Sequence, residues 1–117
     1  MNIFFVVPGN PLPKERPRVM KGWTYTPQRT IDAEKKIGLL AQQAMKGRKP
    51  TTKNVRVRME FYRKTKIRVD YDNLAKLVGD AMNGRVYQDD GQIVEAVIVK
   101  WYDRKNPRTV IEVEEVL

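Results

Sequence analysis

Apolar and polar residues alternate in several parts of the chain, which predicts β-strands. The most regular alternation is at residues 54–62, where the apolar members share one face of the predicted strand: Val55, Val57, Met59 and Phe61. Three other runs rich in apolar and β-branched residues predict further strands: 2–7, 92–102 and 109–116. The polar, Pro-containing turn at 103–108 favours antiparallel pairing of the last two strands.

Two segments instead repeat their apolar residues at helical spacing. The first predicts a helix from an N-cap at Thr30 to about Met45, ended by Gly47, with the apolar stripe Ile31, Ile37, Leu40, Ala41 and Ala44. The second predicts a helix from Asp72 to the turn at Asn83-Gly84, with the apolar stripe Leu74, Leu77, Val78, Ala81 and Met82. Asp80 falls at a position of this second helix that we expect to face solvent.

The segment between the first strand and the first helix has a different composition. Residues 8–28 contain five of the seven prolines, which predicts an ordered, extended loop rather than a helix. Within it, Arg18–Met20 and Trp23–Thr26 are expected to pair as a hairpin around Lys21-Gly22. The order of elements predicts one domain over residues 1–117 of mixed α/β (α+β) class, with a mixed sheet and two main helices.

Composition excludes much chemistry. The chain of 117 residues contains no Cys, His or Ser, so disulfides, Cys/His zinc sites, thiolate or serine nucleophiles and imidazole bases are excluded. Carboxylates and lysines remain, and hard oxygen ligands select Mg²⁺, Mn²⁺ or Ca²⁺. No run is long enough to span a membrane, and the apolar start lacks the basic residues of a signal peptide. We therefore expect a cytoplasmic protein with no membrane partner.

Positive charge is concentrated in one part of the chain. Residues 10–69 carry 17 Lys or Arg against 4 acidic residues, and residues 70–117 carry 6 against 10. Such an excess is typical of a protein that binds nucleic-acid phosphates. Aromatic residues among these cations either stack on bases or pack in the core: Trp23, Tyr25, Phe61 and Tyr62. The alternative is a solvated basic surface that serves solubility.

Four aspartates lie at the two ends of the second predicted helix: Asp70, Asp72, Asp89 and Asp90. Asp70 and Asp72 are two apart at the end of an extended segment, so both can reach one site, and the returning chain can add a third carboxylate. Mutual repulsion of clustered carboxylates is relieved by a divalent cation, which can activate water for phosphodiester hydrolysis. Lys76 projects from the same helix face and can contact a phosphate.

Each of these features also has a purely structural interpretation. Asp72 with Asn73 is then a helix cap, and Asp89-Asp90-Gly91 is a turn before a strand. Lys76 is then an ordinary ion-pair partner of Asp72, four residues earlier.

The compound pattern over residues 68–94 resembles the RusA family of Holliday-junction resolvases. The resemblance rests on Arg68 to Lys76 with its D-x-D-N-x-x-K motif, on Gly79-Asp80-Ala81-Met82, and on Tyr87 to Val94 with its D-D-x-Q-I segment. The openings Pro8-Gly9-Asn10-Pro11 and Lys14-Glu15-Arg16-Pro17-Arg18 also look like those of many members.

The resemblance implies a homodimeric, Mg²⁺-dependent endodeoxyribonuclease, with Mn²⁺ as a substitute and no small-molecule cofactor. Such an enzyme cuts four-way DNA junctions by paired symmetric nicks in recombination and repair, and it associates with the nucleoid while it acts. By position, Asp70, Asp72 and Asp90 are the expected metal-binding catalytic carboxylates, and Lys76 is the catalytic lysine. Asp89 and Asn73 are expected to support the metal ligands. The cations available to grip phosphates are Lys14, Arg16, Arg18, Arg56, Arg58, Lys64, Lys66 and Arg68.

Two alternatives remain open at this point. In the first alternative, the chain is a non-enzymatic nucleic-acid-binding module whose aspartates only cap a helix and form a turn. Otherwise it is a metal nuclease that acts on other branched DNA, such as forks or flaps.

Overall fold

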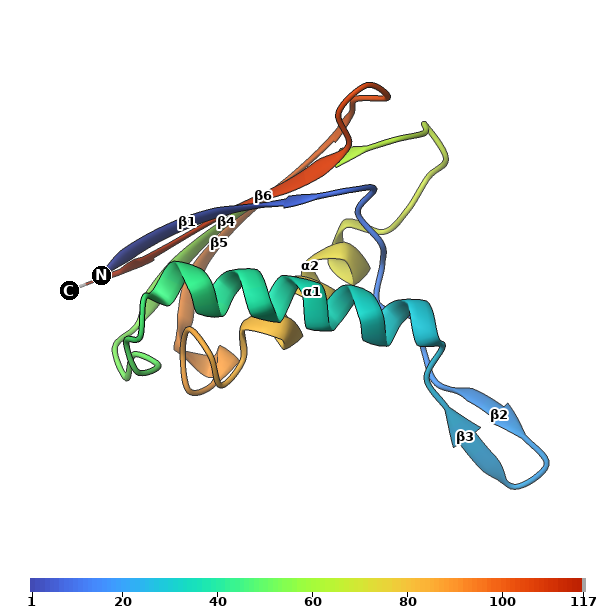
Figure 1. The fold of residues 1–117 in the computed structure, drawn as a ribbon, viewed down its shortest axis with the longest axis horizontal. Coiled ribbons are helices and arrows are strands. Elements are labelled where there is room, and N and C mark those ends of the chain that lie inside the picture. Colours follow the sequence, from blue (N-terminus) through green and yellow to red (C-terminus); the bar gives the residue numbers. More distant parts are fainter. Residues whose placement is uncertain (117) are drawn as a thin grey trace.

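A four-stranded sheet, two helices on one of its faces and a separate hairpin make up the fold in the computed structural model, which describes residues 1–116 (Figure 1). In chain order the elements are β1 (Asn2–Pro8), β2 (Arg18–Met20), β3 (Trp23–Tyr25), α1 (Gln28–Met45), β4 (Val55–Arg63), α2 (Tyr71–Met82), the 3₁₀ helix η1 (Asp90–Gln92), β5 (Ile93–Tyr102) and β6 (Arg108–Glu115). The predicted mixed sheet with two main helices is confirmed.

The strand order in the main sheet is β1-β6-β4-β5. β4 pairs with β5 in parallel, whereas β6 pairs antiparallel with both β4 and β1. The predicted antiparallel pair of β5 and β6 is therefore wrong, because β4 lies between them. The chain leaves β4 through α2 and returns as β5, and a helical crossover of this kind places the second strand parallel and adjacent to the first.

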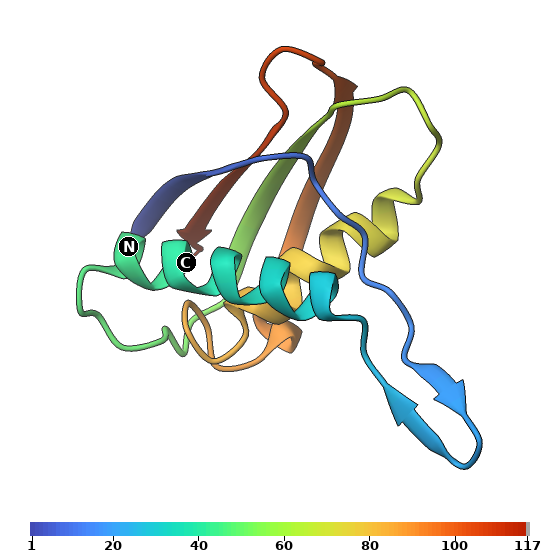
Figure 2. The same ribbon diagram turned by 45° about the vertical axis from the view of Figure 1, so that its right-hand side comes forward.

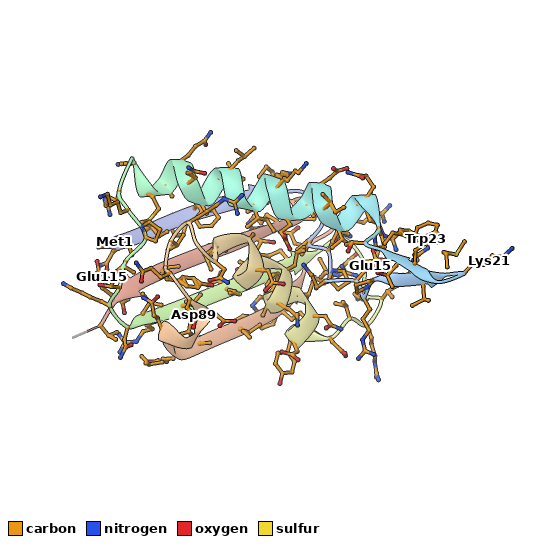
Figure 3. All side chains as sticks on the ribbon, turned by 90° about the horizontal axis from the view of Figure 1, so that it is seen from below. Met1, Glu15, Lys21, Trp23, Asp89 and Glu115 are labelled. Atoms are coloured by element: carbon orange, nitrogen blue, oxygen red, sulfur yellow. The ribbon has the colours of Figure 1, made fainter. Side chains whose placement is uncertain are left out.

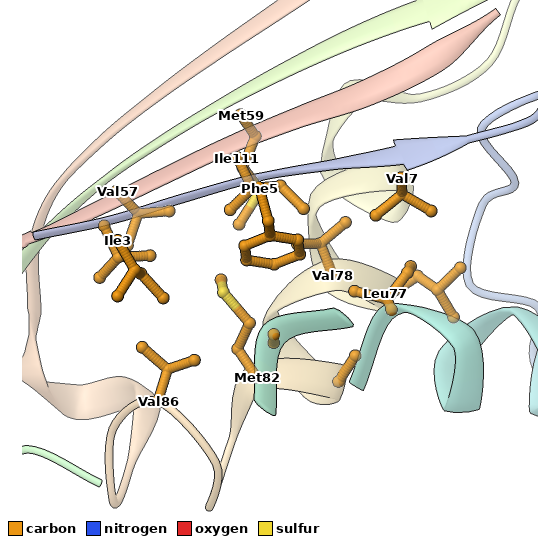
Figure 4. Packing of buried hydrophobic residues seen from close by; sticks show 14 of the residues in the cluster. Ile3, Phe5, Val7, Val57, Met59, Leu77, Val78, Met82, Val86 and Ile111 are labelled. Carbon is orange, nitrogen blue, oxygen red and sulfur yellow. The ribbon is translucent and has the colours of Figure 1, made fainter. Parts of the chain in front are cut away.

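The core lies between the sheet and the helices. The four apolar residues of β4 are buried, as its alternation predicts, and so are all five residues of the α2 stripe. Side chains of β1, β4 and β6 meet α2 in the centre of this layer (Figure 4). The opposite face of the sheet carries no helix.

α1 begins three residues earlier than predicted. Pro27 occupies the N-cap position, and its carbonyl accepts hydrogen bonds from the backbone N–H groups of Thr30 and Ile31. Proline has a fixed φ that suits the start of a helix, so Pro27 sets the boundary, and Thr30 is a buried residue of the first turn. Among the helices of residues 1–116, none is long and apolar enough to cross a membrane.

The predicted hairpin is confirmed and stands away from the rest of the molecule. β2 and β3 form their own two-stranded sheet, which extends beyond the end of α1 (Figures 1 and 2). The two turn residues, Lys21 and Gly22, both have positive φ values, of 35° and 88°. Two consecutive positive φ values are characteristic of the tight turns that match the twist of a hairpin.

Candidate active site

A hollow of about 240 Å³ between α2, η1 and the β4–β5 part of the sheet contains most of the predicted catalytic residues. Its polar lining comes from Asp72, Lys76 and Asp80 of α2 and from Asp90 of η1. The rest of the lining is small or apolar: Val57, Met59, Ala75, Gly79, Ile93, Ala96 and Ile98. Carboxylates and one amine thus share a hollow whose floor is the hydrophobic sheet.

α2 arranges three of these groups in a row. Asp72, Lys76 and Asp80 are spaced by four residues and so follow one side of the helix, while the other side is buried in the core. A rise of 1.5 Å per residue separates Asp72 and Asp80 by about 12 Å along the axis, with Lys76 between them. Lys76 has no ion pair within residues 1–116, so its predicted pairing with Asp72 is absent and its amine is available to a ligand.

Asp89 and Asp90 are neighbours with different surroundings. The Asp89 side chain accepts a hydrogen bond from the Gly91 N–H at 3.1 Å, and the Gln92 side chain accepts one from the Asp89 N–H at 2.9 Å. This reciprocal capping box fixes η1. Asp89 therefore has the structural role that the turn interpretation gave it, and Asp90 lines the hollow.

Asp70 lies at the N-cap of α2, outside the set of residues that line the hollow. Its side chain makes no capping hydrogen bond, and the amide of Asn73 approaches it at 3.5 Å. The structure thus places Asp72 and Asp90 in the lining of one hollow, whereas Asp70 lies at the N-terminus of α2. The proposed ligand set of all three remains a prediction.

Asp80 was not among the predicted site residues, and it is not simply solvent-facing. Its carboxylate lies 3.2 Å from the amine of Lys14, which also hydrogen-bonds Glu34 at 2.6 Å. Burial alone would lower the pKa of Lys14, but hydrogen bonds and charge from Glu34 and Asp80 raise it. The sequence signal for Asp80 was its spacing of four residues from Lys76.

Lys14 also joins the proline-rich loop to α2, because its backbone N–H donates to the carbonyl of Asn73 at 2.9 Å. One of the predicted phosphate-binding cations is thus paired with two partly exposed carboxylates of the protein itself. Its contacts connect the loop, α1 and α2 beside the hollow.

Tyr87 supports the hollow from beneath. This fully buried side chain donates a hydrogen bond from its hydroxyl to the carbonyl of Gly79 at 3.0 Å. Burial and the negative charges of Asp90, Asp80 and Asp89 raise the pKa of the Tyr87 phenol above its usual range. Tyr87 therefore stays protonated and acts as a fixed donor that holds the middle of α2.

A basic surface adjoins Asp70. Residues 63 and 65–69 and the end of β5 line a second hollow of about 270 Å³ that includes Lys66, Arg68 and Lys100. The amine of Lys100 donates to the carbonyl of Val69 at 2.7 Å, which attaches this segment to the sheet directly before Asp70. Arg56 and Arg58 lie elsewhere, on the open face of the sheet, where glutamates neutralise them.

The donor chemistry of the first hollow fits a hard divalent cation, since its charged ligands are carboxylates only. Within residues 1–116, however, no three acidic side chains converge closely enough to hold an ion by themselves. Mg²⁺ is usually bound by one or two carboxylates, with waters and substrate phosphates in the remaining positions. Asp72 and Asp90 therefore fit an ion whose coordination is completed by water and DNA.

Comparisons with known proteins agree with the motif. The model of the family described as "Endodeoxyribonuclease RusA" matches residues 8–114. A curated relative from Bacillus subtilis (strain 168), "Uncharacterized protein YqaN", is 40% identical over 47 residues. That alignment covers 40% of this chain and 32% of the relative, so the chain matches about a third of the relative's length.

Proposed function

Because the chain belongs to the RusA endodeoxyribonuclease family, we propose that it cuts four-way DNA junctions by paired symmetric nicks in a reaction that requires a divalent metal ion. Family membership implies an endodeoxyribonuclease that acts on Holliday junctions, as expected in DNA recombination and repair. The observation that carries the finer proposal is the hollow that Asp72, Lys76 and Asp90 all line, beside a basic surface.

In this proposal Asp72 and Asp90 hold the metal ion, Mg²⁺ or Mn²⁺, and Asp70 adds a ligand or positions water from the start of α2. An ion held by these carboxylates would supply Lewis-acid chemistry for phosphodiester hydrolysis. Water attacks phosphorus and releases a proton to solvent as the new P–O bond forms, one P–O ester bond breaks, and the leaving oxygen takes up a proton. Lys76 donates a hydrogen bond to the phosphate and stabilises the charge that develops on it.

The basic residues next to Asp70 are proposed to position the strand. Lys66 and Arg68 come shortly before Asp70 in the chain and line the adjacent hollow. Neither has an ion pair among the described residues. Lys64, Arg16 and Arg18 are also exposed and available to phosphates. Lys14 is proposed to contribute mainly by holding Asp80, because its amine is already paired.

A two-fold dimer is proposed as the active form, because a four-way junction has approximate two-fold symmetry and two nicks require two sites. β5 supports this proposal. It is an edge strand, and four of its large hydrophobic side chains are exposed: Val94, Val97, Trp101 and Tyr102. An exposed apolar edge is a surface on which a second strand can pair.

Cleavage of a labelled four-way junction beside a linear duplex of the same sequence tests the proposal. With Mg²⁺ we expect symmetric nicks in the junction alone, and with EDTA none. Asp72→Asn should abolish cleavage and preserve or tighten junction binding, because a negative charge facing phosphate is removed. The matched control is Asp32→Asn, an aspartate on α1 outside the first hollow.

The outcomes separate the alternatives. Binding without cleavage under every metal tested would reject the nuclease and support a nucleic-acid-binding module. Equal cleavage of forks or flaps would reject selectivity for four-way junctions. Loss of folding in Asp72→Asn would reject the catalytic role of that residue.

A further inference from the structure

The hairpin of residues 18–25, here called the arm, is the most exposed part of the chain. β2 and β3 pair only with each other, and all six of their residues are exposed. Figure 3 shows Trp23 and Lys21 at the far end of the molecule, well separated from Asp89 beside the candidate active site. A two-stranded hairpin is at best marginally stable alone in water, so an exposed arm of this kind is suited to contact a partner.

One face of the arm is apolar and aromatic. The register pairs Met20 with Trp23 and Arg18 with Tyr25, so these four side chains share a face. The rings of Trp23 and Tyr25 lie 5.4 Å apart, and Trp23 is 56% exposed. On the other face Val19 is 74% exposed. Clustered exposed apolar side chains typically mark a binding surface.

Contacts at its base attach the arm to α1. Its turn has two residues, so there is no long loop at the tip. At its base, Glu15 pairs with Arg29 of α1 and, at 3.5 Å, with Arg18. Arg29 lowers the pKa of Glu15, so this carboxylate stays charged near neutral pH and holds the arm to α1.

Charge indicates the chemistry of the partner. Arg16, Arg18, Lys21 and Arg29 lie on the arm or at its base, and Glu15 is the one acidic residue of residues 14–29. Exposed aromatic rings among cations are what proteins use to bind nucleic acid whose bases have left the stack. An apolar protein partner would not require this positive field.

We propose that the arm inserts at the branch point of DNA and stacks Trp23 on a base that has lost its neighbour there. The proposal rests on the proposed function and adds a residue that selects branched over linear DNA. Apolar wedges between base steps are a known means of kinking DNA, and they act most easily where pairing is already weak. Trp23 is thus a positioning residue, remote from the carboxylates that act on phosphate.

The first experiment measures the unstacking of bases at the branch point directly, without cleavage of the DNA. A four-way junction carries the base 2-aminopurine at its exchange point. The fluorescence of this base rises when it leaves the stack. The buffer contains EDTA, so that no DNA is cut. We expect fluorescence to rise with the wild-type protein and with Phe4→Ala, a control for a similarly exposed aromatic residue on β1. Trp23→Ala should lose the rise, and Trp23→Phe should keep part of it.

Cleavage provides the second measurement. Trp23→Ala should cut the fully paired junction roughly 10- to 100-fold more slowly at subsaturating protein, as expected for the loss of one stacked base. A junction with unpaired thymines at the exchange point needs no opening, so it should restore the variant to within about 3-fold of the wild type. Melting temperatures should be unchanged, because the arm is exposed.

Several outcomes would overturn the proposal. They are a normal 2-aminopurine signal with Trp23→Ala, a cleavage defect that the open junction does not rescue, or an equal loss of affinity for linear duplex. Failure of the proposed function looks different. In that case the wild type opens the junction but cuts no DNA with any metal.

Discussion

Asp89 and Asp90 are adjacent acidic residues whose side chains have different surroundings in the structure. Replacing each one alone should therefore have different effects. Asp89 caps η1 by accepting a hydrogen bond from the Gly91 N–H. Asp90 lines the hollow and makes no side-chain hydrogen bond or ion pair within residues 1–116. Asp89→Ala therefore removes a cap, and Asp90→Asn removes a charge while preserving shape.

The structure sets the size of each effect. Loss of an N-cap costs about 1 kcal/mol, which for a chain of this length lowers the melting temperature by roughly 3 to 6 °C. Asp90→Asn should change the free energy of unfolding by less than about 0.5 kcal/mol in metal-free buffer, because no internal contact is lost. If Asp90 is a metal ligand, its replacement should slow cleavage on the order of 100-fold or more.

Two assays read these effects: thermal unfolding in EDTA and in millimolar Mg²⁺, and single-turnover cleavage of a four-way junction. We expect Asp89→Ala to melt earlier and to cut at a rate near that of the wild type while folded. Asp90→Asn should melt normally in EDTA, gain no stability from Mg²⁺ and fail to cut. The opposite pattern, in which Asp89→Ala abolishes cleavage and Asp90→Asn does not, would refute the assignment of roles.

Three further predictions concern the surroundings of the hollow. Lys76→Ala should lower the single-turnover rate with little change in junction affinity, and an unchanged rate would remove Lys76 from the catalytic set. Tyr87→Phe should cost about 1 kcal/mol in urea unfolding, because the Gly79 carbonyl keeps the Asn83 N–H but loses the buried Tyr87 hydroxyl as a donor, and an unaffected midpoint would contradict that contact. Lys14→Met should also cost about 1 kcal/mol, since it unpairs Asp80 and Glu34. If Lys14→Met lowered the affinity for DNA in a salt titration and left the free energy of unfolding unchanged, Lys14 would instead contact DNA.

Local features of the fold could be predicted because they depend on neighbouring residues. The alternation in β4, the apolar stripe of α2 and the hairpin turn at Lys21-Gly22 each reflect backbone geometry over a few residues. The start of α1 was missed by three residues because Thr30 is a good cap by type, whereas Pro27 determined where the helix could begin.

The candidate site was predicted in part. The motif from Arg68 to Val94 contained Asp72, Lys76 and Asp90, which line one hollow. It did not distinguish Asp89 from Asp90, because either side chain can cap a turn and the backbone conformation decides which one does. Asp80 was overlooked because its partner, Lys14, is far away in the sequence.

The sequence by itself determined the elements, the restriction to carboxylate and lysine chemistry, the basic character and the family motif, since these follow from residue types and short spacings. Only the tertiary structure decided that β4 lies between β5 and β6, that Asp70 is outside the hollow, and that Lys14 reaches Asp80. The physical reason is that strand order and ion pairing depend on contacts between distant segments. A crossover through α2 and the burial of its apolar stripe fix those contacts once the chain has folded.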